Sequence, residues 1–213
     1  MKASEALARV RTGDRTIPIV REGLTVGRLR AVGADDADVL ARWREANRRW
    51  FTTEFPKNPE RTALWVGEVL SSPDRFLVVV ETSAGDCIGH VGLRDINLES
   101  GAAEIDNVVR GSRAPNDEGL MAAAIEALLG FAVGTLGLRR IRLRVFTDNP
   151  AIDFYARLGF EHEGAPIGLA FDQGRGGGTW QPANSDPRRH LQTMVLGPAR
   201  VVDLGGQPKR AEQ

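Results

Sequence analysis

Apolar and polar residues recur along the chain with two different periods, and each period predicts one kind of element. Residues 119–138 carry apolar side chains at 120, 121, 125, 128, 129, 132, 133 and 136, which is a helical repeat with a broad apolar face. Residues 139–149 change to a repeat of two, in which three apolar side chains oppose three arginines: Ile141, Leu143 and Val145 against Arg140, Arg142 and Arg144. The chain therefore passes from its strongest helix into a strand with an arginine face.

The remaining elements are predicted by the same periods and by turn and capping residues. Strands are expected at 24–32, 75–82, 87–97, 102–111, 160–171 and 190–196. Helices are expected at 33–51, 59–72 and, behind the Asp148-Asn149-Pro150 start signal, over a short segment near 150–158. SAGD at 83–86 is typical of a hairpin turn, and residues 172–189 are expected to form a glycine-rich loop. This order of strands and helices indicates an α/β protein.

One strand of this series carries two acidic side chains on a single face. Simple alternation over 102–111 places Glu104, Asp106 and Val108 on one face of that strand. Ile105, Asn107 and Val109 are then expected on the opposite face.

Length and composition suit one domain of ordinary size, since 42% of the residues are hydrophobic. We expect this domain at 23–198, preceded by a polar extension at 1–22 that adds at most a short strand and followed by a loose tail at 199–213. Basic and acidic residues balance at 28 each, so the net charge gives no reason to expect nucleic acid or an anionic membrane as partner.

The sequence also predicts a protein without membrane spans or metal ligands. Its opening lacks the apolar core of a signal peptide, and no apolar stretch approaches the ~20 residues that cross a bilayer, which predicts a cytoplasmic protein. Cys87 is the single cysteine and fits a reducing compartment. The three histidines, His90, His162 and His190, lack metal-ligand spacing, so no metal is expected.

Several of these segments together resemble the GNAT N-acetyltransferase superfamily, over about residues 24–197. They are EIDNVV, an Arg/Gly loop, a long helix, a strand ending in Asp-Asn, and a short helix with FYARLGF. The most specific piece is LRRIRLRVFTDNPAIDFYARLGFEHEG. The resemblance implies a mixed, mostly antiparallel central sheet flanked by helices. It also implies acetyl-CoA as co-substrate in an acyl transfer to an amine.

Tyr155 is the one tyrosine of the chain and the candidate acid of such a reaction. A tyrosine hydroxyl has an ordinary pKa of ~10, so it is protonated at neutral pH and can donate to a departing thiolate. The resemblance assigns this role to Tyr155. The alternative is that Tyr155 only packs beneath the sheet.

The resemblance places the diphosphate of the coenzyme at the start of the long helix, where free N–H groups face an anion. Gly119 keeps the family's middle glycine of that loop, whereas Asn116 and Met121 depart from the usual residues. Asp117 and Glu118 would repel phosphate unless they turn aside, and Arg110 and Arg113 are candidates to compensate. The coenzyme contacts implied are Val108, Val109, Arg110, Gly111, Arg113, Asn116, Gly119, Leu120, Met121, Asn149, Ala151 and Tyr155.

A base for the amine proton is expected on the strand at 102–111. Either Glu104 or Asp106 can accept that proton directly or through water, and the resemblance favours Glu104. The alternative is that both are solvent-facing strand residues.

The acceptor is expected to be a primary amine of a small molecule, and the resemblance points to an amino sugar or a secondary metabolite. Acceptor contacts should come from residues 43–65 and 176–182, which are rich in tryptophan and arginine. A protein N-terminal amine is the alternative acceptor, and a non-catalytic acyl-CoA-binding module is the alternative class. A homodimer is common in the resembled superfamily and is expected as a possibility here.

Overall fold

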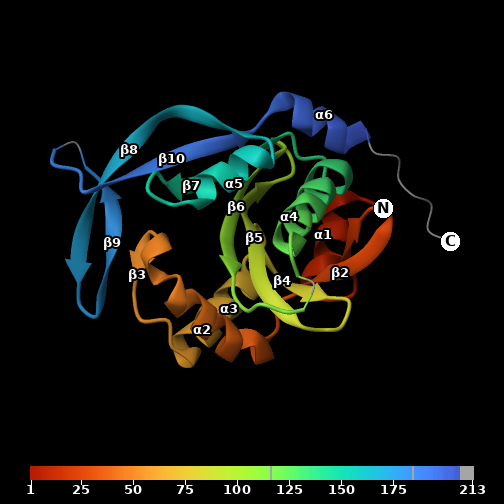
Figure 1. Cartoon of the computed structure of the whole chain (residues 1–213), viewed down its shortest axis with the longest axis horizontal. Coiled ribbons are helices and arrows are strands. Elements are labelled where there is room, and N and C mark those ends of the chain that lie inside the picture. The colour runs from red at the N-terminus through yellow and green to blue at the C-terminus, as the bar shows by residue number, and fades with distance from the viewer. Residues whose placement is uncertain (116, 184, 207–213) are drawn as a thin grey trace.

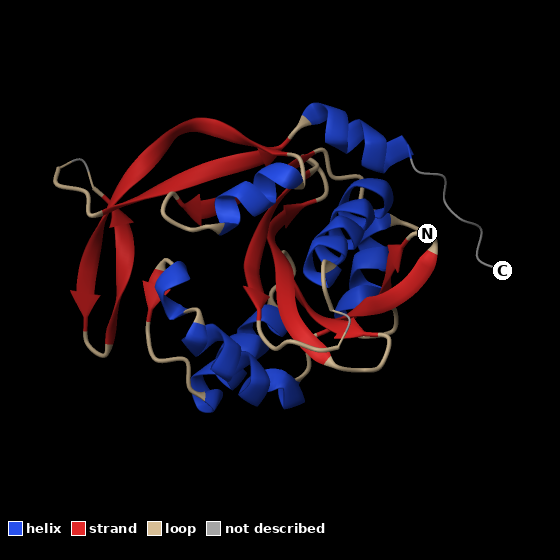
Figure 2. Ribbon diagram, viewed as in Figure 1, coloured by secondary structure: helices blue, strands red, loops and turns tan. Residues whose placement is uncertain are grey.

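The computed structural model describes residues 1–115, 117–183 and 185–206, and a ten-stranded sheet runs through it (Figure 1, Figure 2). The strand order is β1-β2-β4-β5-β6-β7-β10-β8-β9-β3. β6 and β7 are parallel and the other neighbours are antiparallel, which confirms the predicted fold class. The strands are β1 Ile17–Arg21, β2 Leu24–Ala31, β3 Thr53–Glu54, β4 Phe76–Thr82, β5 Cys87–Asn97, β6 Ala102–Arg110, β7 Arg140–Phe146, β8 Phe160–Gly174, β9 Gly177–Pro182 and β10 Arg189–Leu196.

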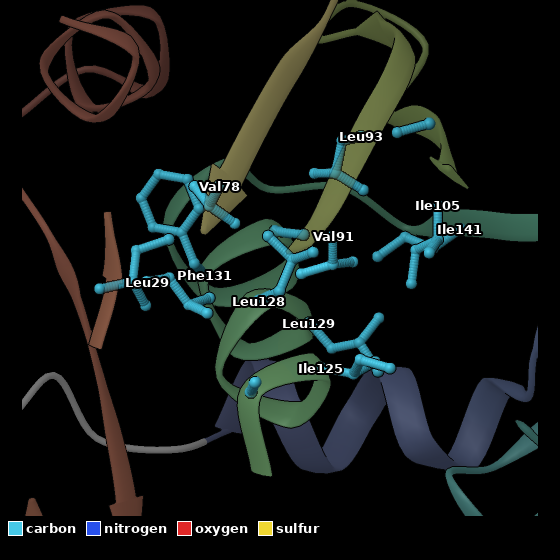
Figure 3. Packing of buried hydrophobic residues seen from close by; sticks show 14 of the residues in the cluster. Leu29, Val78, Val91, Leu93, Ile105, Ile125, Leu128, Leu129, Phe131 and Ile141 are labelled. Carbon is cyan, nitrogen blue, oxygen red and sulfur yellow. The ribbon is translucent and has the colours of Figure 1, made fainter. Parts of the chain in front are cut away.

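Helices cover both faces of this sheet and bury two separate apolar clusters. The helices are α1 Ala3–Arg11, α2 Ala37–Ala46, α3 Pro59–Ser71, α4 Leu120–Gly130, α5 Ala151–Arg157 and α6 Pro198–Gly206. α4 buries Ile125, Leu128 and Leu129 in the larger cluster against the central strands (Figure 3). α2 and α3 close the smaller cluster with Leu40, Trp43 and residues of β4. A helix that is apolar around most of its surface belongs in such a core, which explains the position of α4.

Several predicted elements are confirmed with small changes in their bounds. α3 begins as the sequence suggested, because Asn58 Oδ1 accepts a hydrogen bond from the Arg61 N–H at 2.9 Å and Pro59 starts the helix. The helix expected over 33–51 ends at Ala46, and a 3₁₀ turn follows at Arg48–Trp50. The helix expected over 119–138 is α-helical to Gly130 and continues as a π-helical turn at Phe131–Thr135.

Both ends of the described chain are more ordered than the sequence analysis expected. The segment 1–22 adds a helix, α1, as well as the strand β1, and the tail contains α6. α1 buries Ala6, Leu7 and Val10, and α6 buries Val201 and Leu204, all in the larger cluster. The spacing of Ala6, Leu7 and Val10 is itself helical, so α1 could have been predicted from the sequence.

The glycine-rich loop expected at 172–189 instead contains a strand, β9, which pairs with β8 and with the short β3. Trp180 explains why this segment is ordered. Its ring packs on Phe146 and Phe171, and its Nε1 donates a 2.8 Å hydrogen bond to Glu54. The hairpin and β3 together form the far end of the sheet (Figure 1).

The smaller cluster holds a histidine whose protonation should control stability. His90 is fully buried near Trp43 and Trp65, and burial, reinforced by Arg44, lowers the pKa of its imidazole from 6.5 to about 3. Below about pH 6.5 the unfolded chain binds a proton that the native state excludes. The free energy of unfolding therefore rises with pH between about 3 and 6.5, by about 1.4 kcal/mol per pH unit from this group.

We expect His90→Phe to remove that part of the slope. The measurement is urea unfolding at a series of pH values across this window, and His162→Gln is the matched control because His162 is exposed. Equal slopes for wild type and His90→Phe would show that His90 is not excluded from protonation in the native state.

Candidate active site

The two parallel strands β6 and β7 separate part-way along their length. They pair from Ala102 with Arg140 to Ile105 with Leu143, and the register ends there although β6 runs on to Arg110. Beyond Ile105, no strand within the described residues pairs with the edge of β6 that faces β7, so backbone N–H and C=O groups are available there. An extended ligand can use such an edge as a neighbouring strand would.

A β-bulge lies at the point where the strands separate. Gly92 pairs with Asp106 and His90 with Val109, so β6 has one more residue than β5 over this interval. Asn107, inside the bulge, has a φ of 54°, in the left-handed region that asparagine tolerates better than most residues. The extra residue bends β6 away from β7 and opens the sheet.

The bulge also overturns the alternation predicted for this strand. Ile105 packs in the larger cluster whereas Val109 packs in the smaller one, so these residues lie on opposite faces. Val108, predicted to share a face with Glu104, packs instead against the larger cluster. One inserted residue shifts a period of two by one step, which moves every later side chain to the other face.

A cleft of about 460 Å³ follows the opening between the strands. Its walls come from the segment after α2, from β5, β6 and β7, and from the starts of α4 and α5. Eight of the predicted site residues line it: Glu104, Val108, Val109, Arg110, Met121, Asn149, Ala151 and Tyr155. It is also lined by Asn47, Trp50, Phe51 and Thr52, which lie in the segment expected to contact the acceptor.

Tyr155 reaches this cleft from α5. The side chain is 8% exposed and packs between the rings of Phe154 and Phe160. Burial raises the pKa of its hydroxyl above the ordinary value, because the charged form loses hydration. The hydroxyl is therefore protonated throughout the neutral range.

Asn149 precedes α5 and serves its start. Its Oδ1 accepts a hydrogen bond of 2.9 Å from the Ala151 N–H. The residue also lines the cleft, so the capping role and a ligand contact through its amide group are compatible.

The loop before α4 holds Asp117 away from the helix start. Asp117 Oδ2 accepts a 2.9 Å bond from the Ala114 N–H, and Oδ1 accepts one of 2.9 Å from Arg110. These contacts lower the pKa of the Asp117 carboxyl, with the Ala114 N–H as the main cause. Asp117 thus stabilises the loop, but it also occupies the guanidinium of Arg110.

Gly111 and Gly119 have structural reasons to be glycine in this loop. Gly111 lies against Trp43, where a Cβ would be 2.1 Å from the indole ring. Gly119 precedes α4 with a φ of 71°, which side chains rarely adopt. Neither residue lines the cleft, and nor do Arg113 and Leu120, while Asn116 lies outside the described residues.

Arg21 is a candidate that the sequence analysis missed, although it does not itself line the cleft. It comes from the end of β1, and its Nη1 donates a 2.6 Å hydrogen bond to the Glu118 carbonyl. Its guanidinium lies 3.6 Å from where a Cβ of Gly119 would be, so it adds positive charge at the start of α4. Nothing local in the sequence relates Arg21 to Glu118, because the contact depends on the sheet placing β1 beside α4.

Glu104 forms the centre of an ionic cluster on the floor of the cleft. Its carboxylate contacts Arg94 at 2.5 Å, Arg144 at 3.0 Å and Arg142 at 3.3 Å, and only 4% of the side chain is exposed. Burial raises the pKa of the Glu104 carboxyl, and the arginines oppose this rise. Its Oε2 accepts no hydrogen bond within the described part of the chain.

Asp106 lies further along β6 and is more exposed. It contacts Arg75 at 3.4 Å and accepts a hydrogen bond from the Asn107 amide. Glu104 and Asp106, the two candidate bases, both line the cleft.

The described residues contain neither a candidate metal site nor a candidate membrane-spanning helix. Residues 1–115, 117–183 and 185–206 contain no group of three or more His, Cys, Asp or Glu side chains placed to hold a metal ion. Within the same ranges no helix is both long and apolar enough to span a bilayer.

Comparison with known families decides the identity of this fold. The acetyltransferase (GNAT) domain family matches residues 28–161, which is more than half of the chain. The chain belongs to the GNAT acetyltransferase family. The matched range contains the bulged strand, the loop, α4 and Tyr155, and it confirms the predicted class of acetyl-CoA-dependent N-acetyltransferase.

Solved structures of GNAT acetyltransferases share this fold at low sequence identity. A probable GNAT-family acetyltransferase from Chromobacterium violaceum has a TM-score of 0.65 at 21% identity, over 86% of this chain and 92% of that one. Spermidine N-acetyltransferase from Vibrio cholerae, in complex with CoA and spermine, has a TM-score of 0.64 at 20% identity, over 82% and 96%. A dodecameric structure of the Vibrio enzyme has a TM-score of 0.60 at 22% identity, over 86% and 97%. No curated protein sequence matches the chain.

Proposed function

We propose that this acetyltransferase transfers an acetyl group from acetyl-CoA to a primary amine of a small molecule, with Tyr155 as general acid. The observation that carries the proposal is the opening between β6 and β7, which forms a cleft with Tyr155 in its wall. The cleft has room for a thioester to meet an amine, and it also holds two carboxylates, Glu104 and Asp106.

The residues around the cleft fit a coenzyme A thioester. The unpaired edge of β6 at Val108 and Val109 offers backbone groups to the amide groups of the pantetheine arm. The free N–H groups at the start of α4 suit its diphosphate, and Arg21 supplies positive charge there, while Arg113 stays a candidate from the sequence alone. Asp117 is turned toward Ala114 and Arg110, so its charge is compensated within the loop.

In the proposed step the neutral amine attacks the thioester carbonyl carbon. A C–N bond forms, the C–S bond breaks, and the Tyr155 hydroxyl protonates the departing sulfur. The amine proton passes to Glu104, directly or through water. Asp106 is the alternative base on the same strand.

The function is tested by calorimetric titration with acetyl-CoA, followed by an assay of free thiol release with a panel of amines. Binding in the micromolar range together with amine-dependent thiol release supports the proposal. Binding without turnover on any small amine or on N-terminal peptides would favour the non-catalytic module, and turnover on peptides alone would favour a protein N-terminal acceptor. The possible homodimer stays a prediction.

Arg21 gives a prediction about the coenzyme half of the cleft. We expect Arg21→Gln to weaken acetyl-CoA binding by about 3- to 10-fold, because a charge-assisted contact to phosphate is lost near α4. The effect should shrink as salt is raised, since Arg21 is exposed. Calorimetry at two salt concentrations measures this loss of affinity.

The matched control is Arg28→Gln on the neighbouring strand, where the arginine pairs with Glu81 at 2.7 Å. Unchanged affinity of Arg21→Gln at low salt would exclude this role.

A further inference from the structure

The part of the cleft around Glu104, which we assign to the acceptor, carries an excess of arginine over carboxylate. β5 contributes Arg94 and β7 contributes Arg144 to the lining, and Arg142 of β7 lies beside it; all three contact the one carboxylate of Glu104. Arg94 is shared with Asp95, which lies 3.9 Å away and is 58% exposed. Within the described chain, Arg142 and Arg144 have no acidic partner other than Glu104.

Other charges near the floor do not remove this excess. Asp106 is matched by Arg75 at 3.4 Å. Arg44 is 7% exposed and donates to Asn107 in the bulge, so it adds a further positive charge beneath the cleft. The lining carboxylates are Glu104 and Asp106, so no acidic group of the lining remains for a multiply charged cation.

Arg142 and Arg144 also keep unused hydrogen-bond donors. Each approaches Glu104 through its Nε, and within the described residues the two terminal nitrogens of each guanidinium form no hydrogen bond to protein. Their side chains are 46% and 41% exposed, whereas Glu104 is 4% exposed. Glu104 thus holds each guanidinium by its Nε, and the terminal N–H groups stay available to an anionic ligand.

We propose that the acceptor is an amine that also carries an anionic oxygen group, a carboxylate or a phosphate, which Arg144 of the lining binds with the adjacent Arg142 adding positive charge. The inference rests on the proposed function and narrows its substrate class. Positive charge at this site disfavours the ammonium form of the incoming amine, so the same arginines favour the neutral nucleophile that the reaction needs. A polyamine is repelled there.

Matched amines that differ in one charged group test the inference. The pairs are β-alanine with β-alaninamide, 4-aminobutyrate with 4-aminobutanamide, and glucosamine 6-phosphate with glucosamine, and spermidine is tested alongside. We expect kcat/KM to be about 10- to 100-fold higher for the anionic member of at least one pair, the range of a hydrogen-bonded ion contact. The amide pairs report a carboxylate and the sugar pair reports a phosphate.

Variants of β7 connect that preference to the arginines. Arg144→Gln should lower the ratio of kcat/KM for the preferred anionic amine to kcat/KM for its neutral partner by about 10-fold, and Arg142→Gln should lower the same ratio less, because Arg142 lies outside the cleft lining. A loss common to both amines reports the contact of these arginines with Glu104. The control is Arg140→Gln on the same strand, whose guanidinium pairs with Glu163 at 2.5 Å instead of Glu104. It should leave both rates within about twofold of wild type.

The outcomes distinguish a failure of this inference from a failure of the proposed function on which it rests. If acetyl-CoA binds and amines are acetylated, but neutral amines or spermidine are preferred and Arg144→Gln has no selective effect, the inference is wrong and the function stands. If acetyl-CoA neither binds nor stabilises the folded protein, the proposed function itself fails.

Discussion

Replacing Tyr155 by phenylalanine is expected to lower kcat by about 100-fold or more while leaving acetyl-CoA affinity within about threefold of wild type. The substitution removes only the hydroxyl. The ring keeps its contacts with Phe154 and Phe160, so the loss falls on protonation of the leaving sulfur. Steady-state kinetics and calorimetric titration on the same preparation measure the two quantities.

The pH profile gives a second measurement of the same role. Burial raises the pKa of Tyr155, so its ionisation should not reduce the wild-type rate below about pH 10. Any loss of rate between neutral pH and about pH 10 would have to come from another group. A Tyr155→Phe enzyme as fast as wild type at every pH would exclude Tyr155 as the acid.

Phe160→Leu is the control that separates chemistry from packing. Phe160 lies edge-on to Tyr155 with ring centroids 6.3 Å apart, and it is 2% exposed. We expect this variant to lose about 1 kcal/mol of stability or more while kcat changes only a few-fold. A fall in kcat as large as that of Tyr155→Phe would mean that ring position, and not the hydroxyl, limits the rate.

Much of the fold could be predicted because local patterns determine most of its elements. The Asn58-Pro59 start of α3, the SAGD turn between β4 and β5, and the broad apolar face of α4 all act over a few residues. The segment from Asn149 to Tyr155 could be predicted for the same reason: Asn149 precedes α5, α5 carries Tyr155, and both residues line the cleft.

The parts that the sequence did not show depend on contacts between distant segments. A single extra residue in β6 reverses the faces of Val108 and Val109, and alternation alone gives no sign of it. Arg21 lies beside Gly119 only because the fold brings β1 next to α4. The arginine face of β7 was visible in the sequence, but its convergence on Glu104 required the parallel pairing of β6 with β7.

The loop before α4 should be the part of the site most sensitive to a small substitution, and Gly111→Ala tests this. The added Cβ would lie 2.1, 2.2 and 2.4 Å from three ring atoms of Trp43. Trp43 cannot easily yield, because its indole stacks on His90 and its Nε1 donates a 3.0 Å bond to Ser112 Oγ. The Gly111 N–H is itself bonded to the Ile88 carbonyl at 2.8 Å. Either the ring or the loop must move.

We expect Gly111→Ala to lower the free energy of unfolding by about 1–3 kcal/mol, the cost of overpacking a filled core. Acetyl-CoA affinity should fall by about 10-fold or more, because the displaced loop carries the start of α4 with it. Denaturant unfolding and calorimetric titration measure the two effects.

Gly130→Ala is the matched control at the other end of α4. Gly130 has helical angles, φ −58° and ψ −42°, and beyond its chain neighbours and its own helix backbone no atom of the described residues lies within 4 Å of an added Cβ. This variant should gain about 0.5–1 kcal/mol, because alanine restricts the unfolded chain and favours a helix. A Gly111→Ala protein as stable as wild type and with unchanged acetyl-CoA affinity would show that Trp43 does not hold the loop in place. The contrast between two identical substitutions thus separates close contact with Trp43 from the general effect of replacing a glycine.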